Sequence, residues 1–232
     1  MIKRGLEKMP SKPKFTAWSY SRLGDYEQCP LRAKLKHIDK IKEPGSAAMD
    51  RGATIHGLAA QYLQGTIKGF PKELALFKAD FTELRKKFSS TLRIEEQWAF
   101  TKDWQACEWF GAYAWLRMVL DTAYFPESGA MRIIDYKTGR VRGEEQKPQL
   151  SLYALGGFLL MPDVHSIVAE FWYIDHGETL TETFERGQLA GLKKHWAKKA
   201  RGMFVDKIFA PRPGDKCRWC HYGAAKLGQC KF

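Results

Sequence analysis

Two acidic residues and one lysine lie where the apolar pattern predicts the ends of neighbouring β-strands. Asp121 follows apolar residues in segment 114–125, and Asp135 and Lys137 lie two residues apart in segment 131–138 (MRIIDYKT). Because side chains alternate between the two faces of a strand, Asp135 and Lys137 share a face. Turn residues between the segments predict a hairpin that brings Asp121 toward Asp135. Two carboxylates this close repel each other and favour a bound cation, and oxygen ligands suit Mg²⁺ or Mn²⁺.

A structural role for these residues is the alternative that the pattern leaves open. Asp121 would then cap the turn, and Asp135 and Lys137 would form an ion pair at the edge of the sheet. An acid and a lysine separated by one residue are a weak indication by themselves, so the rest of the chain has to distinguish the two roles.

The cysteines form a second group with metal-binding spacing. Cys217 and Cys220 are separated by two residues, which lets two thiolates on one tight turn reach the same ion, and Cys230 follows farther along the tail. Soft thiolates select zinc or an iron–sulfur cluster, and three cysteines need a fourth ligand. Cys107 fits no such pattern, and we expect it to be a small buried apolar side chain.

Length, composition and charge limit the classes of protein. The chain has 232 residues, of which 44% are apolar, and this suits one large domain or a domain with a small appendage. It contains neither an apolar run long enough to span a membrane nor a signal peptide, so we expect an intracellular, cytoplasmic protein, nucleoid-associated or phage-encoded, without membrane contact. The net charge of +12 is concentrated at both ends, and the centre is mildly acidic. Basic flanks attract a nucleic acid, although a solvated basic surface has the same composition.

The elements that must position these residues change type along the chain. Apolar spacing at helical intervals predicts a helix through Tyr20, Leu23 and Tyr26, a second from Pro30, and others over 47–64, 72–88, 148–160 and 188–203. Strand patterns cover 92–100, 114–125, 131–138, 166–174 and 180–184. This order predicts an α/β fold with a small mixed sheet flanked by helices.

The motif IIDYKTG (133–139), followed by QLSLYAL (149–155), resembles the RecB-like branch of the PD-(D/E)XK nuclease superfamily. Further resemblances occur in the same order along the chain, in SYSRLGDYEQCPLRAKL (19–35), RGATIHGL (51–58), VLDTAYF (119–125) and CRWC (217–220) with a later cysteine. The cysteines resemble those of the iron–sulfur subgroup, which includes the AddB nuclease domain and CRISPR-associated adaptation nucleases. One departure is Arg117, which lies near the place where the family usually has a small residue.

The resemblance implies a restriction-endonuclease-like fold and a divalent-metal-dependent DNA nuclease. It favours an exonuclease acting in DNA repair, recombination or phage DNA processing. The implied metal ligands are His56, Asp121, Asp135 and the carbonyl of Tyr136, and the implied catalytic residues are Asp121, Asp135, Lys137, Gln149 and Tyr153. In this scheme Lys137 positions or helps to deprotonate the attacking water, and Gln149 and Tyr153 line the site.

The resemblance also assigns the cysteines and divides the chain. Cys29, Cys217, Cys220 and Cys230 would hold a structural [4Fe–4S] cluster; zinc, with His221 in place of Cys230, is the alternative. The expected division is a basic flexible arm over 1–18, a nuclease domain over 19–210, and a Cys-rich tail over 211–232 that packs with Cys29. The nuclease domain would have a helical part over about 19–90 and a catalytic core over about 91–210.

The implied partner is DNA, through single-stranded or double-stranded ends. The chain lacks a P-loop, and whether a helicase or recombinase supplies the DNA stays open. Lysines of the helix predicted over 188–203 would contact phosphates, unless they form an ordinary solvated helix face. Trp18, Trp104 or Trp219 would stack on bases, unless they are core residues. The alternative functions are a catalytically inactive DNA-binding protein and a zinc-stapled adaptor with the same fold.

Overall fold

The computed structural model describes residues 14–232, which form two compact units. The sheet unit consists of residues 17–20 and 44–199, and the terminal unit consists of the described residues up to 16 with 21–43 and 200–232. These limits differ from the division expected at residues 18 and 210, because the first helices group with the tail. No helix in the described residues combines the length and the apolar character needed to cross a membrane.

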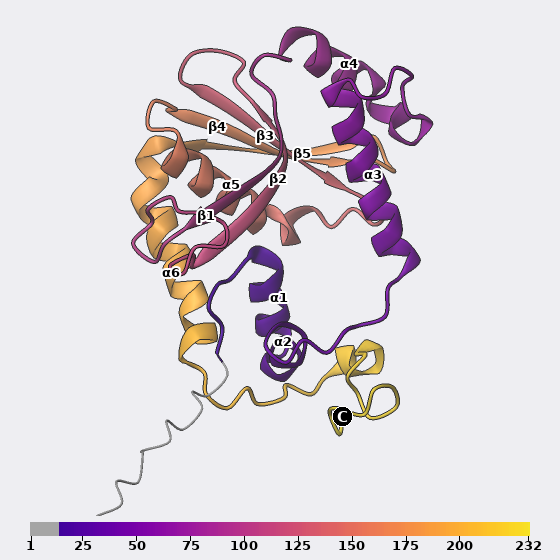
Figure 1. Cartoon of the computed structure of the whole chain (residues 1–232), viewed down its shortest axis with the longest axis vertical. Helices are drawn as coiled ribbons and strands as arrows, with labels where there is room; N and C mark the ends of the chain where they lie inside the picture. The colour runs from indigo at the N-terminus through magenta and orange to yellow at the C-terminus, as the bar shows by residue number, and fades with distance from the viewer. Residues whose placement is uncertain (1–13) are drawn as a thin grey trace, which may run out of the picture. The chain divides into compact units, whose positions relative to one another are not determined.

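A five-stranded mixed sheet forms the centre of the sheet unit (Figure 1). Its strands are β1 (Arg93–Phe100), β2 (Leu116–Tyr124), β3 (Ala130–Lys137), β4 (Ser166–Tyr173) and β5 (Glu178–Glu185), and they lie in chain order across the sheet. All neighbouring strands are antiparallel except β3 and β4, which are parallel and joined through helix α5 (Lys147–Leu160). This mixed sheet with flanking helices confirms the predicted α/β, restriction-endonuclease-like fold class.

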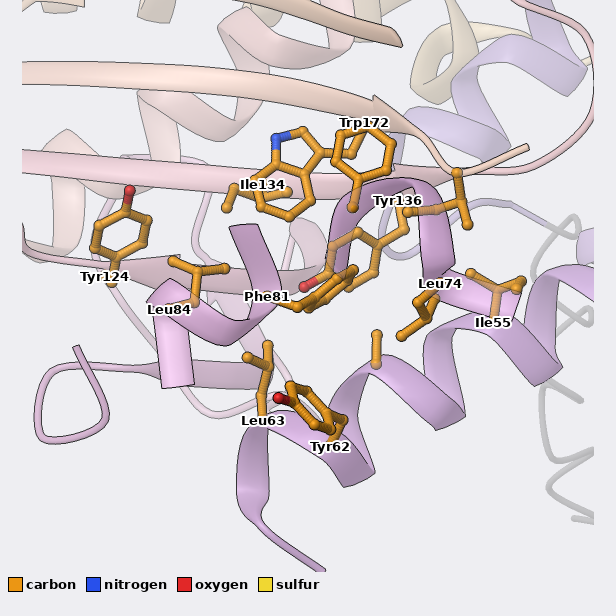
Figure 2. Packing of buried hydrophobic residues seen from close by; sticks show 13 residues of the cluster. Ile55, Tyr62, Leu63, Leu74, Phe81, Leu84, Tyr124, Ile134, Tyr136 and Trp172 are labelled. Atoms are coloured by element: carbon orange, nitrogen blue, oxygen red, sulfur yellow. The ribbon is translucent and has the colours of Figure 1, made fainter. Parts of the chain in front are cut away.

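Helices α3 (Ala47–Gln64) and α4 (Lys78–Lys87) pack on one face of the sheet. Figure 2 shows Phe81 of α4 next to Tyr136 of β3, with Trp172 of β4 beside them. The ring centres of Phe81 and Tyr136 are 5.3 Å apart. Ser46 precedes α3 as its N-cap, and its hydroxyl oxygen accepts a hydrogen bond from the Met49 N–H, a common arrangement at the start of a helix.

The single helix predicted over 72–88 is two elements, the 3₁₀ helix η1 (Lys72–Phe77) and α4. The junction lies at Phe77, whose backbone leaves the α-helical region (φ −114°, ψ 23°). Both pieces still bury the predicted apolar stripe, because residues three apart lie on one side of a 3₁₀ turn, and residues three or four apart lie on one side of an α-helix. The spacing therefore predicted burial correctly but not the break.

Helix α5 covers the opposite face of the sheet at close range. A β-carbon at Gly157 would lie 2.7 Å from the Ile167 side chain, and one at Gly156 would lie 2.5 Å from that of Met118. Two adjacent glycines therefore let the helix backbone lie almost directly on β2 and β4. This close approach places the first turns of α5, which carry Gln149 and Tyr153, next to the end of β3.

The terminal unit contains most of α1 (Tyr20–Gln28), α2 (Pro30–His37), the end of α6 (Leu189–Val205) and the 3₁₀ helix η4 (Asp215–Trp219). The tail is held to its first helices by specific contacts: the Tyr222 hydroxyl donates to the Ile41 carbonyl at 2.8 Å, and the Tyr26 hydroxyl donates to Asp206 at 2.9 Å. Asp25 and Glu43 pair with cations of α2 at several points.

The basic arm predicted over 1–18 falls largely in residues 1–13, outside the described residues. At its described end, Phe15, Ala17 and Trp18 are buried, so these residues are part of the packed protein. Phe15 contacts Phe209 edge to face, and the Trp18 N–H and carbonyl are hydrogen-bonded to residues 115 and 117. The arm was predicted from its charge, and charge does not indicate that these apolar side chains are buried.

Candidate active site

Asp121 lies where strands β2 and β3 stop pairing. Their ladder ends at the Thr122–Ile134 pair. Beyond it, the side chain takes the place of the backbone, because Asp121 Oδ2 accepts a hydrogen bond from the Tyr136 N–H at 2.6 Å. Asp121 is only 6% exposed. Its carboxylate is therefore held in an opening between two strands.

His56 projects from α3 toward the same opening. Its Nδ1 lies 2.9 Å from Asp121 Oδ1, and its Nε2 lies 3.1 Å from the carbonyl oxygen of Tyr136. The structure thus brings together three of the four groups predicted as metal ligands: the imidazole, the first carboxylate and the backbone carbonyl.

A clamp at the end of β3 holds α3 against this site. Asp175 accepts a hydrogen bond from the Gly139 N–H at 2.8 Å and forms an ion pair with Arg51, which precedes His56 on α3. Gly139 has a φ of +75°, a left-handed conformation that glycine adopts easily. The turn that follows Lys137 is therefore tied to the helix that carries the histidine.

Asp135, Lys137, Gln149 and Tyr153 form a closed ring of polar contacts. Lys137 Nζ lies 2.5 Å from Asp135 Oδ2 and donates to Gln149 Oε1 at 3.1 Å. The Gln149 amide donates to the Tyr153 hydroxyl at 2.8 Å, and that hydroxyl donates to Asp135 Oδ1 at 2.5 Å. Gln149 and Tyr153 reach the ring from one turn of α5. The predicted catalytic residues of β3 and α5 are therefore adjacent.

The donor set fits a divalent cation. Asp135 is 5% exposed, and its Oδ2 is buried without a hydrogen bond in the described residues, having only the ion pair with Lys137. An ionised carboxylate oxygen has more than one lone pair, so Asp135 can keep the ion pair and still bind a cation. Carboxylate oxygens, a backbone carbonyl and an imidazole are ligands that Mg²⁺ or Mn²⁺ accepts.

The pKa values of the site residues are also consistent with a site for a cation. Burial and the charge of nearby Asp135 raise the pKa of Asp121 above its usual value. Burial opposes protonation of His56, but the hydrogen bond and charge of Asp121 outweigh it and raise the pKa of the imidazole. Burial and the Asp135 charge also raise the pKa of Tyr153 well above 10.0, so the phenol stays protonated and acts as a donor. Without a metal ion, the site attracts protons because its negative charge is uncompensated.

Glu95 of β1 joins this cluster and was not predicted. One ligand atom each from His56, Glu95 and Asp121 lie within 4.8 Å of one another. Partial burial and the charge of Asp121 raise the pKa of Glu95. A signal was present in the sequence, since the adjacent acids Glu95 and Glu96 interrupt the alternation of a strand (LRIEEQWAF).

The four predicted cluster cysteines line one pocket of about 290 Å³ in the terminal unit. Cys29 lies just before α2, with its sulfur 3.4 Å from the Arg212 backbone nitrogen, and the other three cysteines come from the tail. Cys107 is outside this pocket and is half-buried rather than buried as expected.

The tryptophans predicted to stack on bases differ in exposure. Trp18 is fully buried and stacks on Trp196, so it is a core residue and the stacking prediction for it is wrong. Trp104 is partly exposed and packs edge-on against Trp115, whereas Trp219 is 70% exposed.

Comparison with protein families and with solved structures finds proteins that are similar to this chain. The family model for the PD-(D/E)XK nuclease superfamily matches residues 17–225. No curated protein sequence matches the chain. Among solved structures, a "Putative exonuclease" from Eubacterium rectale is 14% identical with a TM-score of 0.50, over 89% of this chain and 88% of its own. The structure of SSO0001 is also 14% identical, with a TM-score of 0.43, over 90% of this chain and 84% of its own. Because the family model covers nearly the whole chain, this protein belongs to the PD-(D/E)XK nuclease superfamily.

Proposed function

We propose that this nuclease is a divalent-metal-dependent DNA exonuclease that hydrolyses phosphodiester bonds in DNA repair, recombination or phage DNA processing. The observation that carries the proposal is the adjacency of two groups of residues. The polar ring through Asp135 and Lys137 lies beside the opening that contains Asp121 and His56, because both of these residues contact the backbone of Tyr136, the residue between Asp135 and Lys137. An exonuclease is favoured because the resemblance is to the histidine-bearing branch of the family, and His56 has that position.

In this proposal, His56, Asp121, Asp135 and the Tyr136 carbonyl hold Mg²⁺ or Mn²⁺. A bound ion would stabilise charge on the phosphate and lower the pKa of the attacking water. The buried Oδ2 of Asp135, whose partner in the described residues is the Lys137 ammonium group, would bind such an ion through its other lone pair.

Lys137 supplies the positive charge that the protein itself contributes. Its hydrogen bond to Gln149 uses one of the three ammonium protons, and the ion pair with Asp135 holds the ammonium group in place, so a proton is left for the attacking water or a phosphate oxygen. The ring fixes the direction of this remaining donor, and a preorganised donor stabilises developing charge better than a mobile one.

A cleavage assay with linear and circular single-stranded DNA tests the activity. With Mg²⁺ or Mn²⁺, we expect linear end-labelled DNA to be degraded and circular DNA to persist. Lys137→Ala should lose cleavage by about a thousandfold or more while retaining DNA binding, as expected for the loss of a charge at the reacting phosphate. Lys87→Ala, which removes an exposed lysine of α4, is the matched control and should cleave normally.

Two results would contradict this function. Cutting of circular DNA would replace the exonuclease with an endonuclease. DNA binding without any cleavage would favour the catalytically inactive DNA-binding protein.

We also propose that Cys29, Cys217, Cys220 and Cys230 bind a structural [4Fe–4S] cluster in their shared pocket. What supports the proposal is that four soft thiolate ligands line one pocket, and a set of four thiolates is the ligand set of a [4Fe–4S] cluster. Anaerobically purified protein should absorb near 400 nm and contain about four irons per chain. Zinc with a colourless protein would support the zinc-stapled alternative.

A further inference from the structure

The loop that joins β1 to β2 presents aromatic side chains to solvent. Five of the twelve residues over 104–115 are aromatic. Of these, Phe110 is 86% exposed and Tyr113 is 83% exposed. Large apolar groups that gather at a protein surface are typical of a binding site.

Consecutive turns hold these two rings in place. The Gly111 N–H donates to the Glu108 carbonyl oxygen at 2.9 Å, and the Ala114 N–H donates to the Gly111 carbonyl oxygen at 3.0 Å. A β-carbon at Gly111 would lie 3.0 Å from the Glu108 carbonyl oxygen, so the first turn favours glycine. Phe110 and Tyr113 flank Gly111, and the turns therefore present both rings from an ordered backbone.

Arg117 of β2 lies against this loop. Its guanidinium carbon is 5.7 Å from the ring centre of Trp109 and 5.9 Å from that of Phe110. Within the described residues, its buried Nε lacks a hydrogen bond. A guanidinium that aromatic rings hold in place, and that keeps N–H donors available, is suited to binding a phosphate.

Arg117 and the active site lie on the same side of β2. Met118 packs against α5, so its neighbours Arg117 and Val119 point to the opposite side of the strand. This is the side from which His56 of α3 reaches Asp121. A ligand that extends from Asp121 along this side of β2 therefore meets Arg117.

The separation of Arg117 from the active site fits a short piece of one DNA strand. Four residue steps of about 3.3 Å place Arg117 about 13 Å from Asp121 along β2. Stacked nucleotides rise about 3.4 Å each, so about four of them span this distance. The surface between is open, since Val119 is 40% exposed and its partner in β1, Gln97, is also exposed.

We propose that Arg117 binds a phosphate of the DNA strand that extends from the active site, that Phe110 and Tyr113 stack on its bases, and that the protein consequently prefers single-stranded DNA. This inference rests on the proposed function, which places the reacting phosphate beside Asp121. Stacking on rings requires free base faces, which paired bases inside a duplex do not offer. The guanidinium beside the rings favours a polyanion over an apolar protein surface, which would bury the charge unpaired.

Fluorescence anisotropy with labelled DNA in chelator tests this inference without relying on cleavage. The unaltered protein should bind a single-stranded oligonucleotide more tightly than the duplex of the same sequence. Phe110→Ala and Tyr113→Ala should each weaken single-strand binding about fivefold or more, as the loss of one stacked base predicts, and should leave duplex binding unchanged. Ile208→Ala, which removes an equally exposed apolar side chain from the terminal unit, is the control and should bind like the unaltered protein.

A salt titration separates phosphate binding by Arg117 from a structural role. Arg117→Met keeps a long side chain against the rings, and thermal unfolding verifies that the variant is folded. Loss of one phosphate contact should make the slope of log affinity against log salt concentration less steep by about 0.7 for a single strand. Weaker binding with an unchanged slope would overturn the phosphate contact, because a loosened loop lowers the affinity at every salt concentration.

The remaining outcomes are distinct. Unchanged single-strand affinity in all three variants, with cleavage by the unaltered protein intact, would overturn the inference and leave the proposed function standing. Equal losses for single-stranded and duplex DNA would overturn the preference for single strands. A changed oligomeric state in sedimentation, with unchanged DNA affinity, would also overturn the inference and assign the rings to a contact between copies of the chain. Single-strand binding that depends on the loop, without any cleavage, would support the inference and contradict the nuclease activity.

Discussion

Replacement of Tyr153 by phenylalanine isolates the ring that orients Lys137. The Tyr153 hydroxyl donates to Asp135 and accepts from the Gln149 amide, and the residue is 5% exposed. Tyr153→Phe removes these two hydrogen bonds but keeps the aromatic ring of the side chain, so no cavity forms. The Asp135 carboxylate loses a donor, and Gln149 loses the contact that holds its amide toward Lys137.

The expected effect follows from the charged acceptor. A hydrogen bond to a charged group contributes about 1.5–3 kcal/mol. If that free energy is lost from the orientation of Lys137 in the transition state, cleavage slows roughly ten- to a hundredfold, since about 1.36 kcal/mol corresponds to a factor of ten. DNA affinity should stay unchanged, because the removed hydroxyl is buried.

Single-turnover cleavage at saturating Mn²⁺ measures this effect for Tyr153→Phe, Gln149→Ala and the double variant. Because both residues hold the same ring, their effects should not add, and the double variant should cleave about as slowly as the slower single variant. Cleavage by Tyr153→Phe at the unaltered rate, or strictly additive losses, would refute the reasoning that the ring positions Lys137.

Three further predictions concern packing, pH and the cysteines. Gly157→Ala should lower the free energy of unfolding by about 1–3 kcal/mol in urea titrations, because the added methyl group would lie 2.7 Å from the Ile167 side chain. In metal-free protein, the raised pKa values of His56 and Asp121 mean that the folded state binds these protons more tightly than the unfolded state. The His56 contribution to stability is complete below the unfolded pKa of about 6.5 and is lost as the pH rises through the higher folded value, which thermal unfolding in chelator will detect. Cys220→Ala should lower the melting temperature and the iron content more than the cleavage rate of the protein that remains folded.

Each of these predictions has a matched control. Gly191→Ala of α6 adds a methyl group with nothing within 4 Å and should not destabilise the protein. His56→Gln should flatten the pH dependence above pH 6.5, and an unchanged slope would assign that dependence to another group. Cys107→Ala removes the cysteine outside the pocket and should keep its iron, whereas a stable but inactive Cys220→Ala protein would make the cluster catalytic.

The sequence by itself determined the types of most elements and the local placement of the chemistry. Alternation in β3 put Asp135 and Lys137 on one face, and the four-residue spacing in α5 put Gln149 and Tyr153 on one side of a helix. Both patterns repeat over a few residues, so they depend on backbone geometry that is independent of distant contacts.

Only the tertiary structure decided the contacts between distant segments. It brought Glu95 next to Asp121 and His56, and it buried Trp18, a candidate for stacking on bases. It also divided the helix expected over 72–88 at Phe77, whose ring stacks on Trp172 of β4. Register, burial and such breaks are set by packing between segments far apart in the chain, and this packing overrides local propensity.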